Sequence, residues 1–274
     1  MVEVKTLKTF AALFTALAAL LAALPAVAEP LAPIRVILVG DSTMTDKSGY
    51  GKGFCARFTT EVTCINAARG GRSSKSYRVE GLWDKVMEQL GDSNTYARTY
   101  VWIGFGHNDG SAKPDRHTDL ETEFPVNMRG FAREIQAAGA VPVMVTPLTK
   151  RWFLNGILKD DLGPWASAIR VVASDGGYAL VDVYDVTRTA VQAMGPIAAN
   201  RTAGAPIPQN ILDSEGSGTS VPAVFNDASQ SAATTGQAFD YTHLGPDGSA
   251  LFGKLIIDAW AAQDESIRPY VKVE

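Results

Sequence analysis

The chain has 274 residues, of which 46% are hydrophobic and 20% charged, and its formal net charge is −4. This length and composition suffice for one domain with a sizeable buried core. The slightly acidic balance lacks the basic field that nucleic acids or polyphosphates require, so neither is an expected partner.

The first 28 residues have the features of an export signal rather than of a folded element. Two lysines precede a run over residues 10–24 that is apolar except for Thr15, and residues 25–28 end in the small-x-small pattern that a signal peptidase cleaves. The run is shorter than the roughly 18–20 apolar residues of a membrane-spanning helix, which disfavours the alternative of an uncleaved anchor. We therefore expect a secreted, extracellular protein whose residues 29–274 form a single domain, with no membrane contact in its mature form.

The apolar patterns along the chain alternate between two kinds of element. In chain order they predict a strand over residues 34–39, a helix over 54–60, a strand over 62–66, a helix over 82–90, a strand over 99–105, a helix over 124–138, a strand over 141–145, a helix over 164–174, a strand over 178–183 and a last helix over 251–261. Strands that alternate with helices imply right-handed βαβ units. We therefore predict an α/β fold, a three-layer α/β/α sandwich around a central parallel sheet.

One segment interrupts this alternation. Residues 195–237 are rich in small and polar residues, and we predict a long loop insertion there, longer than an ordinary connection. The segment directly precedes a candidate site block, so it is either a wall or lid over the site or a mobile surface insertion. Asn200 begins an Asn-Arg-Thr sequon and is a candidate glycosylation site in a host that glycosylates.

The two cysteines, Cys55 and Cys64, lie nine residues apart in the mature part of the chain. In an oxidising compartment such an isolated pair favours a disulfide, with two buried thiols as the alternative. The three histidines show no ligand spacing with the cysteines, so we expect neither a zinc site nor any other metal or cofactor.

Four short blocks, at residues 40–44, 70–73, 106–109 and 240–243, together supply the parts of a hydrolytic active site. Ser42 follows the first strand directly and is the candidate nucleophile. Asp240 and His243 lie three apart, a spacing that lets the carboxylate orient the imidazole as a general base. Taken singly, Ser42 is better explained as a helix N-cap, and Asp240 and His243 are equally well explained as a solvated turn residue and a hydrogen-bonded histidine. Their joint occurrence in this order favours a catalytic triad.

The same blocks provide candidate donors for an oxyanion hole. These are the backbone N–H groups of Ser42 and Gly71 and the side-chain amide of Asn108, although Asn108 also lies in an Asn-Asp-Gly sequence typical of turns. Arg72 and Arg78, in and after the second block, are candidates for binding an acidic substrate, with solvent exposure as the alternative.

These blocks resemble those of the SGNH (GDSL-type) hydrolase superfamily, which is named after one Ser, one Gly, one Asn and one His in four sequence blocks. In this chain the corresponding residues are Ser42, Gly71, Asn108 and His243, and Asp240 lies three positions before the histidine. The longer runs around them resemble the rhamnogalacturonan acetylesterase family. The resemblance implies a flavodoxin-like fold and metal-free removal of acetyl groups from pectic rhamnogalacturonan. The segment 195–237 departs from the compact pattern of that family.

We therefore expect a carboxylic ester hydrolase that acts on an acetylated plant cell-wall polysaccharide through an acetyl-serine intermediate, with rhamnogalacturonan as the first expected substrate and the protein acting as a monomer in pectin degradation. One alternative is a lipase or lysophospholipase of the same superfamily, which requires an apolar channel. Another is an esterase for xylan or a further polysaccharide. A non-catalytic sugar-binding protein is disfavoured by the complete triad.

Overall fold

The computed structural model describes residues 31–91, 95–225 and 238–273. Residues 32–274 form one compact unit, and nearly all of the other unit, 1–31, lies outside the described residues, as does the predicted export signal. No helix within the described ranges is long and apolar enough to cross a membrane.

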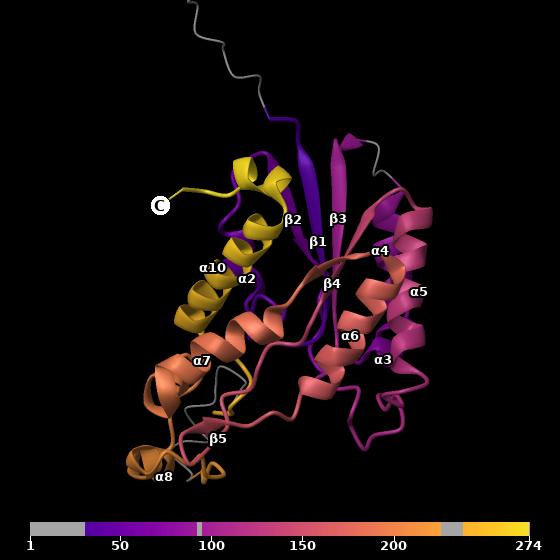
Figure 1. Ribbon diagram of the computed structural model, residues 1–274. Helices are drawn as coiled ribbons and strands as arrows, with labels where there is room; N and C mark the ends of the chain where they lie inside the picture. The colour runs from indigo at the N-terminus through magenta and orange to yellow at the C-terminus, as the bar shows by residue number, and fades with distance from the viewer. Residues whose placement is uncertain (1–30, 92–94, 226–237, 274) are drawn as a thin grey trace, which may run out of the picture. The chain divides into compact units, whose positions relative to one another are not determined.

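Five parallel strands form the central sheet (Figure 1). They are β1 (Ile34–Gly40), β2 (Val62–Asn66), β3 (Arg98–Gly104), β4 (Val141–Val145) and β7 (Ala179–Val181). The spatial order is β2-β1-β3-β4-β7, so in chain order the five strands are arranged 2-1-3-4-5, the flavodoxin-like order. All five lie where the sequence predicted strands, and the predicted fold class is confirmed.

Helices cover both faces of the sheet, because alternate strand residues point to opposite sides. Val36 and Leu38 pack in one buried cluster, and Ile37 and Val39 pack in the other. The first face is covered by α2 (Gly51–Cys55), α7 (Val183–Asn200) and α10 (Pro246–Gln263). The second is covered by α3 (Ser74–Val79), α4 (Leu82–Leu90), α5 (Phe124–Ala137) and α6 (Gly163–Gly176). Figure 1 shows α2, α7 and α10 on one side of the strands and α3, α4 and α5 on the other.

The helices α2 and α10 pack closely against each other. The site block at residues 40–44 precedes α2 and the block at 240–243 precedes α10, so this packing helps to bring the two blocks together. A Cβ on Gly53 would lie 1.9 Å from the carbonyl oxygen of Ser249, so only glycine permits this approach. The backbone N–H of Gly53 donates to Ser249 Oγ across the contact (3.1 Å). The predicted disulfide between Cys55 and Cys64 is present and ties the end of α2 to β2.

The segment predicted as a long loop contains helices. α7 continues to Asn200 past a break at Gly195, and α8 (Gln209–Ser214) and the 3₁₀ helix η3 (Glu215–Ser217) follow, while residues 226–237 lie outside the described ranges. Ile211, Val221 and Phe225 pack with Phe239 and Tyr241 in a small separate apolar cluster. The described part of the segment, up to residue 225, thus packs against the residues that lead into the turn at 240–243.

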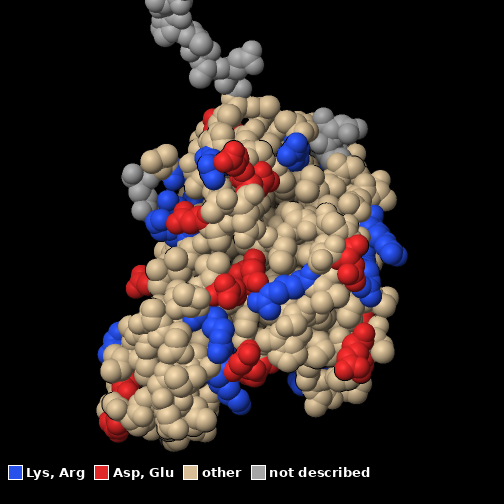
Figure 2. Space-filling view, viewed as in Figure 1, with Lys and Arg blue, Asp and Glu red and all other residues tan. Residues whose placement is uncertain are grey.

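The described residues also include the hairpin of β5 (Phe153–Leu154) and β6 (Ile157–Leu158), and the 3₁₀ helix η5 (Glu265–Tyr270) near the C-terminus. On the face drawn in Figure 2, acidic and basic side chains are interspersed over the surface. That face therefore carries no broad basic field of the kind that a nucleic acid requires.

Candidate active site

Ser42, His243 and Asp240 lie in one chain of hydrogen bonds at the carboxyl edge of the sheet. Ser42 Oγ lies 2.8 Å from His243 Nε2, and His243 Nδ1 lies 2.6 Å from Asp240 Oδ2. Because a carboxylate only accepts, Nδ1 carries the proton and Nε2 is left to accept the serine hydroxyl. The structure thus brings together the three predicted triad residues, across 201 positions of sequence, in the geometry that lets imidazole deprotonate serine.

The carboxylate of Asp240 is held in its ionised form by its surroundings. Burial alone would raise the pKa of Asp240, but the hydrogen bonds from the His243 side chain and from the backbone N–H groups of His243 and Thr242 outweigh it and lower the pKa to about 2. Both N–H groups donate to Oδ1 at 2.7 Å, which leaves Oδ2 directed at the imidazole. Asp240 is therefore charged throughout the pH range in which an esterase works.

A buried arginine that the sequence analysis missed holds this turn in place. Arg151, 1% exposed, follows β4, and its Nη2 donates to the carbonyl oxygens of Asp240 (2.8 Å) and His243 (2.9 Å), while Nη1 donates to that of Thr242 (3.1 Å). Burial lowers its pKa to about 10, with Asp240 opposing, so Arg151 remains cationic at neutral pH. The planar fork of the guanidinium presents its donors in fixed directions, so one side chain serves three carbonyls of the turn.

Replacing Arg151 with methionine is expected to lower the free energy of unfolding by about 3 kcal/mol or more, because three partly buried carbonyls lose a charged donor. Arg151→Lys restores the charge but not the fork, so we expect it to recover part of the stability while kcat stays reduced. Denaturant unfolding and the kcat for p-nitrophenyl acetate measure the two effects separately. A lysine variant with wild-type kcat would show that the turn keeps its geometry without the guanidinium.

The predicted oxyanion donors lie around the same serine. Gly71 has a φ of +76°, a conformation that favours glycine, and the side-chain amide of Asn108 donates one hydrogen to the carbonyl oxygen of Arg72 (3.0 Å). That bond fixes the amide plane and leaves its second hydrogen for an oxyanion. A cavity of about 400 Å³ opens over Ser42, and its lining residues are Ser42, Lys47, Ser48, Gly70, Gly71, Asn108, Arg116 and His243.

Asp109 organises the loop that carries Asn108. Its carboxylate is fully buried and accepts hydrogen bonds from the N–H and hydroxyl of Ser74, the hydroxyl of Thr118 and the N–H of Gly106. Burial raises the pKa of Asp109 to about 6 in spite of these donors. The carboxylate therefore joins α3, the end of β3 and the segment after Asn108 at one point.

This raised pKa predicts a pH dependence of stability. Between about pH 4 and 6 the folded protein binds a proton at Asp109 that the unfolded chain has released, so this group lowers the free energy of unfolding as the pH rises, by up to about 3 kcal/mol. Asp109→Asn does not titrate, and its stability curve should lack that slope. Urea unfolding of both proteins at several pH values measures the difference, and parallel curves would contradict the expectation.

His107 is not placed to act as the base. Its Nε2 donates to the carbonyl oxygen of Leu148 (2.8 Å), and burial lowers its pKa, with Asp41 opposing, so the imidazole stays neutral.

The two arginines named as candidates for binding an acidic substrate contact groups of the protein itself. Arg72 donates from Nε and Nη2 to Glu80 and from Nη1 to the carbonyl oxygen of Gly70, and Arg78 pairs with Glu134 and lies over the Phe131 ring. Neither side chain lines the cavity over Ser42. Sequence alone does not show which arginine faces a neighbouring carboxylate.

The candidate glycosylation site is also at odds with the structure. Asn200 ends α7, and only 3% of its surface is exposed. A glycan on its side-chain amide would have no room in the folded protein, so the sequon at Asn200 does not mark an accessible attachment site.

Comparison with known proteins places this site in a family. The model of the GDSL-like lipase/acylhydrolase family matches residues 36–256. Rhamnogalacturonan acetylesterase RhgT of Bacillus subtilis is 32% identical over 177 residues, which cover 62% of this chain and 73% of that protein.

Two solved structures share the fold. Protein YxiM of Bacillus subtilis has a TM-score of 0.59 at 18% identity, over 85% of this chain and 58% of that one, so this chain spans less than two thirds of YxiM. Axe2, an acetylxylan esterase from Geobacillus stearothermophilus, has a TM-score of 0.52 at 13% identity, over 84% and 93%. The match over residues 36–256, together with this fold, establishes that the chain belongs to the GDSL-like lipase/acylhydrolase family and is a carboxylic ester hydrolase.

Proposed function

We propose that this chain is an exported serine esterase that removes acetyl groups from a plant cell-wall polysaccharide, with rhamnogalacturonan as its substrate. The observation that carries the proposal is the hydrogen-bonded chain from Ser42 through His243 to Asp240 at the base of an open, polar cavity. The name and 32% identity of the relative RhgT support the pectic substrate.

The proposed reaction follows from this geometry. Ser42 Oγ attacks the acetyl carbonyl while His243 Nε2 takes the hydroxyl proton, and Asp240 stabilises the imidazolium. The oxyanion accepts hydrogen bonds from the N–H groups of Ser42 and Gly71 and from the Asn108 amide, each worth roughly 3 kcal/mol in the transition state. The imidazolium then protonates the departing sugar oxygen, which leaves an acetyl ester on Ser42.

Deacylation repeats these steps with water as the nucleophile. His243 removes a proton from water, the resulting hydroxide attacks the acetyl-serine, and the same donors hold the second oxyanion. Collapse returns the proton to Ser42 Oγ and releases acetate. No step uses a metal or an organic cofactor.

The residues that line the cavity favour a substrate with a short acyl group over a lipase substrate with a long acyl chain. Its lining residues are small or polar, and none of the described ones is a leucine, isoleucine, valine or phenylalanine. A long acyl chain requires an apolar channel to shield it from water.

The disulfide supports export. Cys55 and Cys64 are joined, and disulfides persist in oxidising compartments outside the cytosol. Together with the export signal expected in residues 1–28, this favours an extracellular site of action, where plant polysaccharide is encountered.

The test is acetate release by the purified protein from acetylated rhamnogalacturonan and acetylated xylan, beside hydrolysis of a long-chain p-nitrophenyl ester. We expect the highest kcat/KM on rhamnogalacturonan. A preference for xylan would keep the mechanism and replace the substrate. A preference for the long-chain ester would favour a lipase, and no hydrolysis of any of the three would contradict the proposal altogether.

A further inference from the structure

The cavity over Ser42 is lined by cations but not by carboxylates. Among the described residues that line it, Lys47 and Arg116 are charged, and none is an aspartate or glutamate. The net charge of the whole chain is negative, so this positive lining is a local feature. A cavity of one sign, partly enclosed by protein, concentrates ligands of the opposite sign.

Arg116 is held at the edge of the oxyanion site by its own segment. Its Nη1 lies 3.2 Å from the position of a Cβ built on Gly71, so the guanidinium covers that glycine. Lys75 Nζ donates to the carbonyl oxygens of Pro114 and His117 on either side, and Thr118 binds the buried Asp109. These contacts keep the backbone of Arg116 fixed beside the nucleophile.

The charge of Arg116 is only weakly compensated. Its one ion pair within the described structure joins Nε to Asp115 Oδ2 at 3.7 Å, and the Asp115 side chain is 68% exposed. The Arg116 side chain is 32% exposed, and the Nη1 beside Gly71 makes no part of that contact. Arg116 therefore presents planar N–H donors to the cavity, the geometry that matches a carboxylate.

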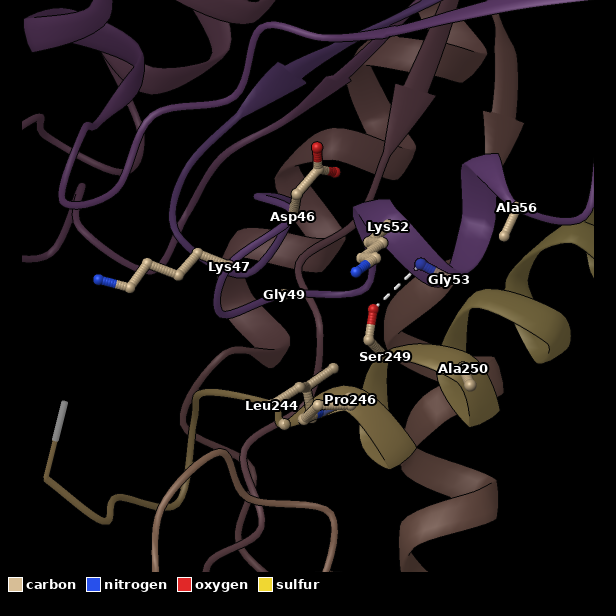
Figure 3. A pocket seen from close by; sticks show the side chains of 11 residues that line it. Asp46, Lys47, Gly49, Lys52, Gly53, Ala56, Leu244, Pro246, Ser249 and Ala250 are labelled. Carbon is tan, nitrogen blue, oxygen red and sulfur yellow. Dashed lines mark hydrogen bonds between the residues drawn. The ribbon is translucent and has the colours of Figure 1, made fainter. Parts of the chain in front are cut away.

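Lys47 lies where the cavity over Ser42 meets a second cavity. This second cavity has a volume of about 390 Å³ and lies between α2 and the start of α10 (Figure 3). Lys47 lines both cavities, and in Figure 3 its ammonium group points away from Lys52 and Ser249. A polymer bound over Ser42 and extending into the second cavity would pass this side chain.

Building on the proposed function, we infer that Arg116 and Lys47 form a carboxylate-binding site that selects substrates in which the acetylated sugar is a uronic acid. In such a sugar the carboxylate and the acetylated hydroxyl belong to one ring, so a carboxylate held by Arg116 places the ester near Ser42. Neutral xylose rings offer no such anchor. Arg116 and Lys47 would thus supply the recognition of an acidic substrate for which Arg72 and Arg78 were the candidates from sequence.

The test uses one polymer in two forms, acetylated rhamnogalacturonan with free uronate carboxylates and the same polymer with those carboxylates methyl-esterified. The readout is acetate, so methanol release does not interfere. We expect the wild type to favour the free acid in kcat/KM by about tenfold, the lower end for charge-assisted hydrogen bonds because both cations are partly exposed. This ratio should fall as salt is added.

Three variants distinguish binding of the carboxylate at Arg116 and Lys47 from long-range electrostatic attraction by the protein. Arg116→Gln should bring the ratio close to one, Lys47→Gln should lower it less, and Arg116→Lys should retain most of it. Lys113→Gln is the matched control, because it removes one cation from the same exposed segment but does not line the cavity. Its ratio should equal that of the wild type.

Two results for the wild type and the Arg116→Gln variant alone overturn the inference while leaving the proposed function intact. One is a wild type that deacetylates both polymer forms equally well, and the other is an Arg116→Gln variant that keeps the wild-type ratio. A wild type that hydrolyses p-nitrophenyl acetate but releases no acetate from either polymer would overturn the proposed function as well. If Arg116→Gln and Lys113→Gln lowered the kcat/KM ratio equally, long-range charge would explain the preference for the free acid. That result would also reject a carboxylate-binding site.

Discussion

Replacing Ser42 with alanine is expected to lower the kcat for acetyl ester hydrolysis by about 10⁶-fold, the scale of loss when a triad nucleophile is removed. Without Oγ there is no atom to form the acetyl ester, and His243 Nε2 loses its hydrogen-bond partner. The oxyanion donors still bind the ester, so slow hydrolysis by water should remain at a rate above the uncatalysed one. The measurement is the initial rate on p-nitrophenyl acetate with highly purified protein.

Ser48 offers a matched control for this loss. Its hydroxyl lines the same cavity and donates to the carbonyl oxygen of Ser42 (3.2 Å), a bond that does not involve the imidazole of His243. We expect Ser48→Ala to lower kcat by less than about tenfold, the cost of one neutral hydrogen bond. If Ser42→Ala kept even a hundredth of the wild-type kcat, the nucleophile would have to be another group.

β1, β3 and β4 were predictable from sequence because they are buried on both faces, which makes their residues apolar almost without interruption. Among the helices that escaped prediction, α7 and α3 did so for identifiable reasons. α7 is rich in β-branched residues and contains Gly195-Pro196, so its local propensity opposes a helix that packing against α10 nonetheless stabilises. α3 is six residues long, and it depends on the capping box of Ser73 and Ser76 and on the buried Asp109.

The triad could be predicted because its chemistry is carried by local sequence. Asp240 and His243 lie in one turn, and Ser42 follows a strand whose carboxyl end must lie at the ligand-binding edge of the sheet. Arg151, Lys47 and Arg116 carried no such signal. Each reaches the site from a segment whose position is set only by tertiary packing, and a lone cation in a loop is usually solvated.

Replacing Asp240 with asparagine is expected to lower kcat by about 10⁴-fold while preserving the shape of the site, because the effect acts through the imidazole tautomer. The N–H groups of Thr242 and His243 already point at Oδ1, so the amide oxygen of the introduced asparagine would occupy that position and its NH₂ would face His243 Nδ1. Two donors cannot face each other, so Nδ1 would lose its proton and Nε2 would carry it. Nε2 could then no longer accept the proton of Ser42.

The stability of the same variant at acid pH independently measures how much the Asp240 carboxylate contributes to the free energy of unfolding. Because the pKa of Asp240 is lowered from its ordinary value to about 2, its contribution to stability is fully present above about pH 4 and is lost as the pH falls towards 2. Asp240→Asn lacks this contribution at every pH, so its free energy of unfolding should approach that of the wild type as both are acidified. If kcat fell while the difference in unfolding free energy stayed constant between about pH 5 and pH 2, the carboxylate would matter to the tautomer of His243 but not to the fold. If kcat did not fall, His243 would have to be oriented without Asp240, and the turn held by Arg151 would be the remaining source of that orientation.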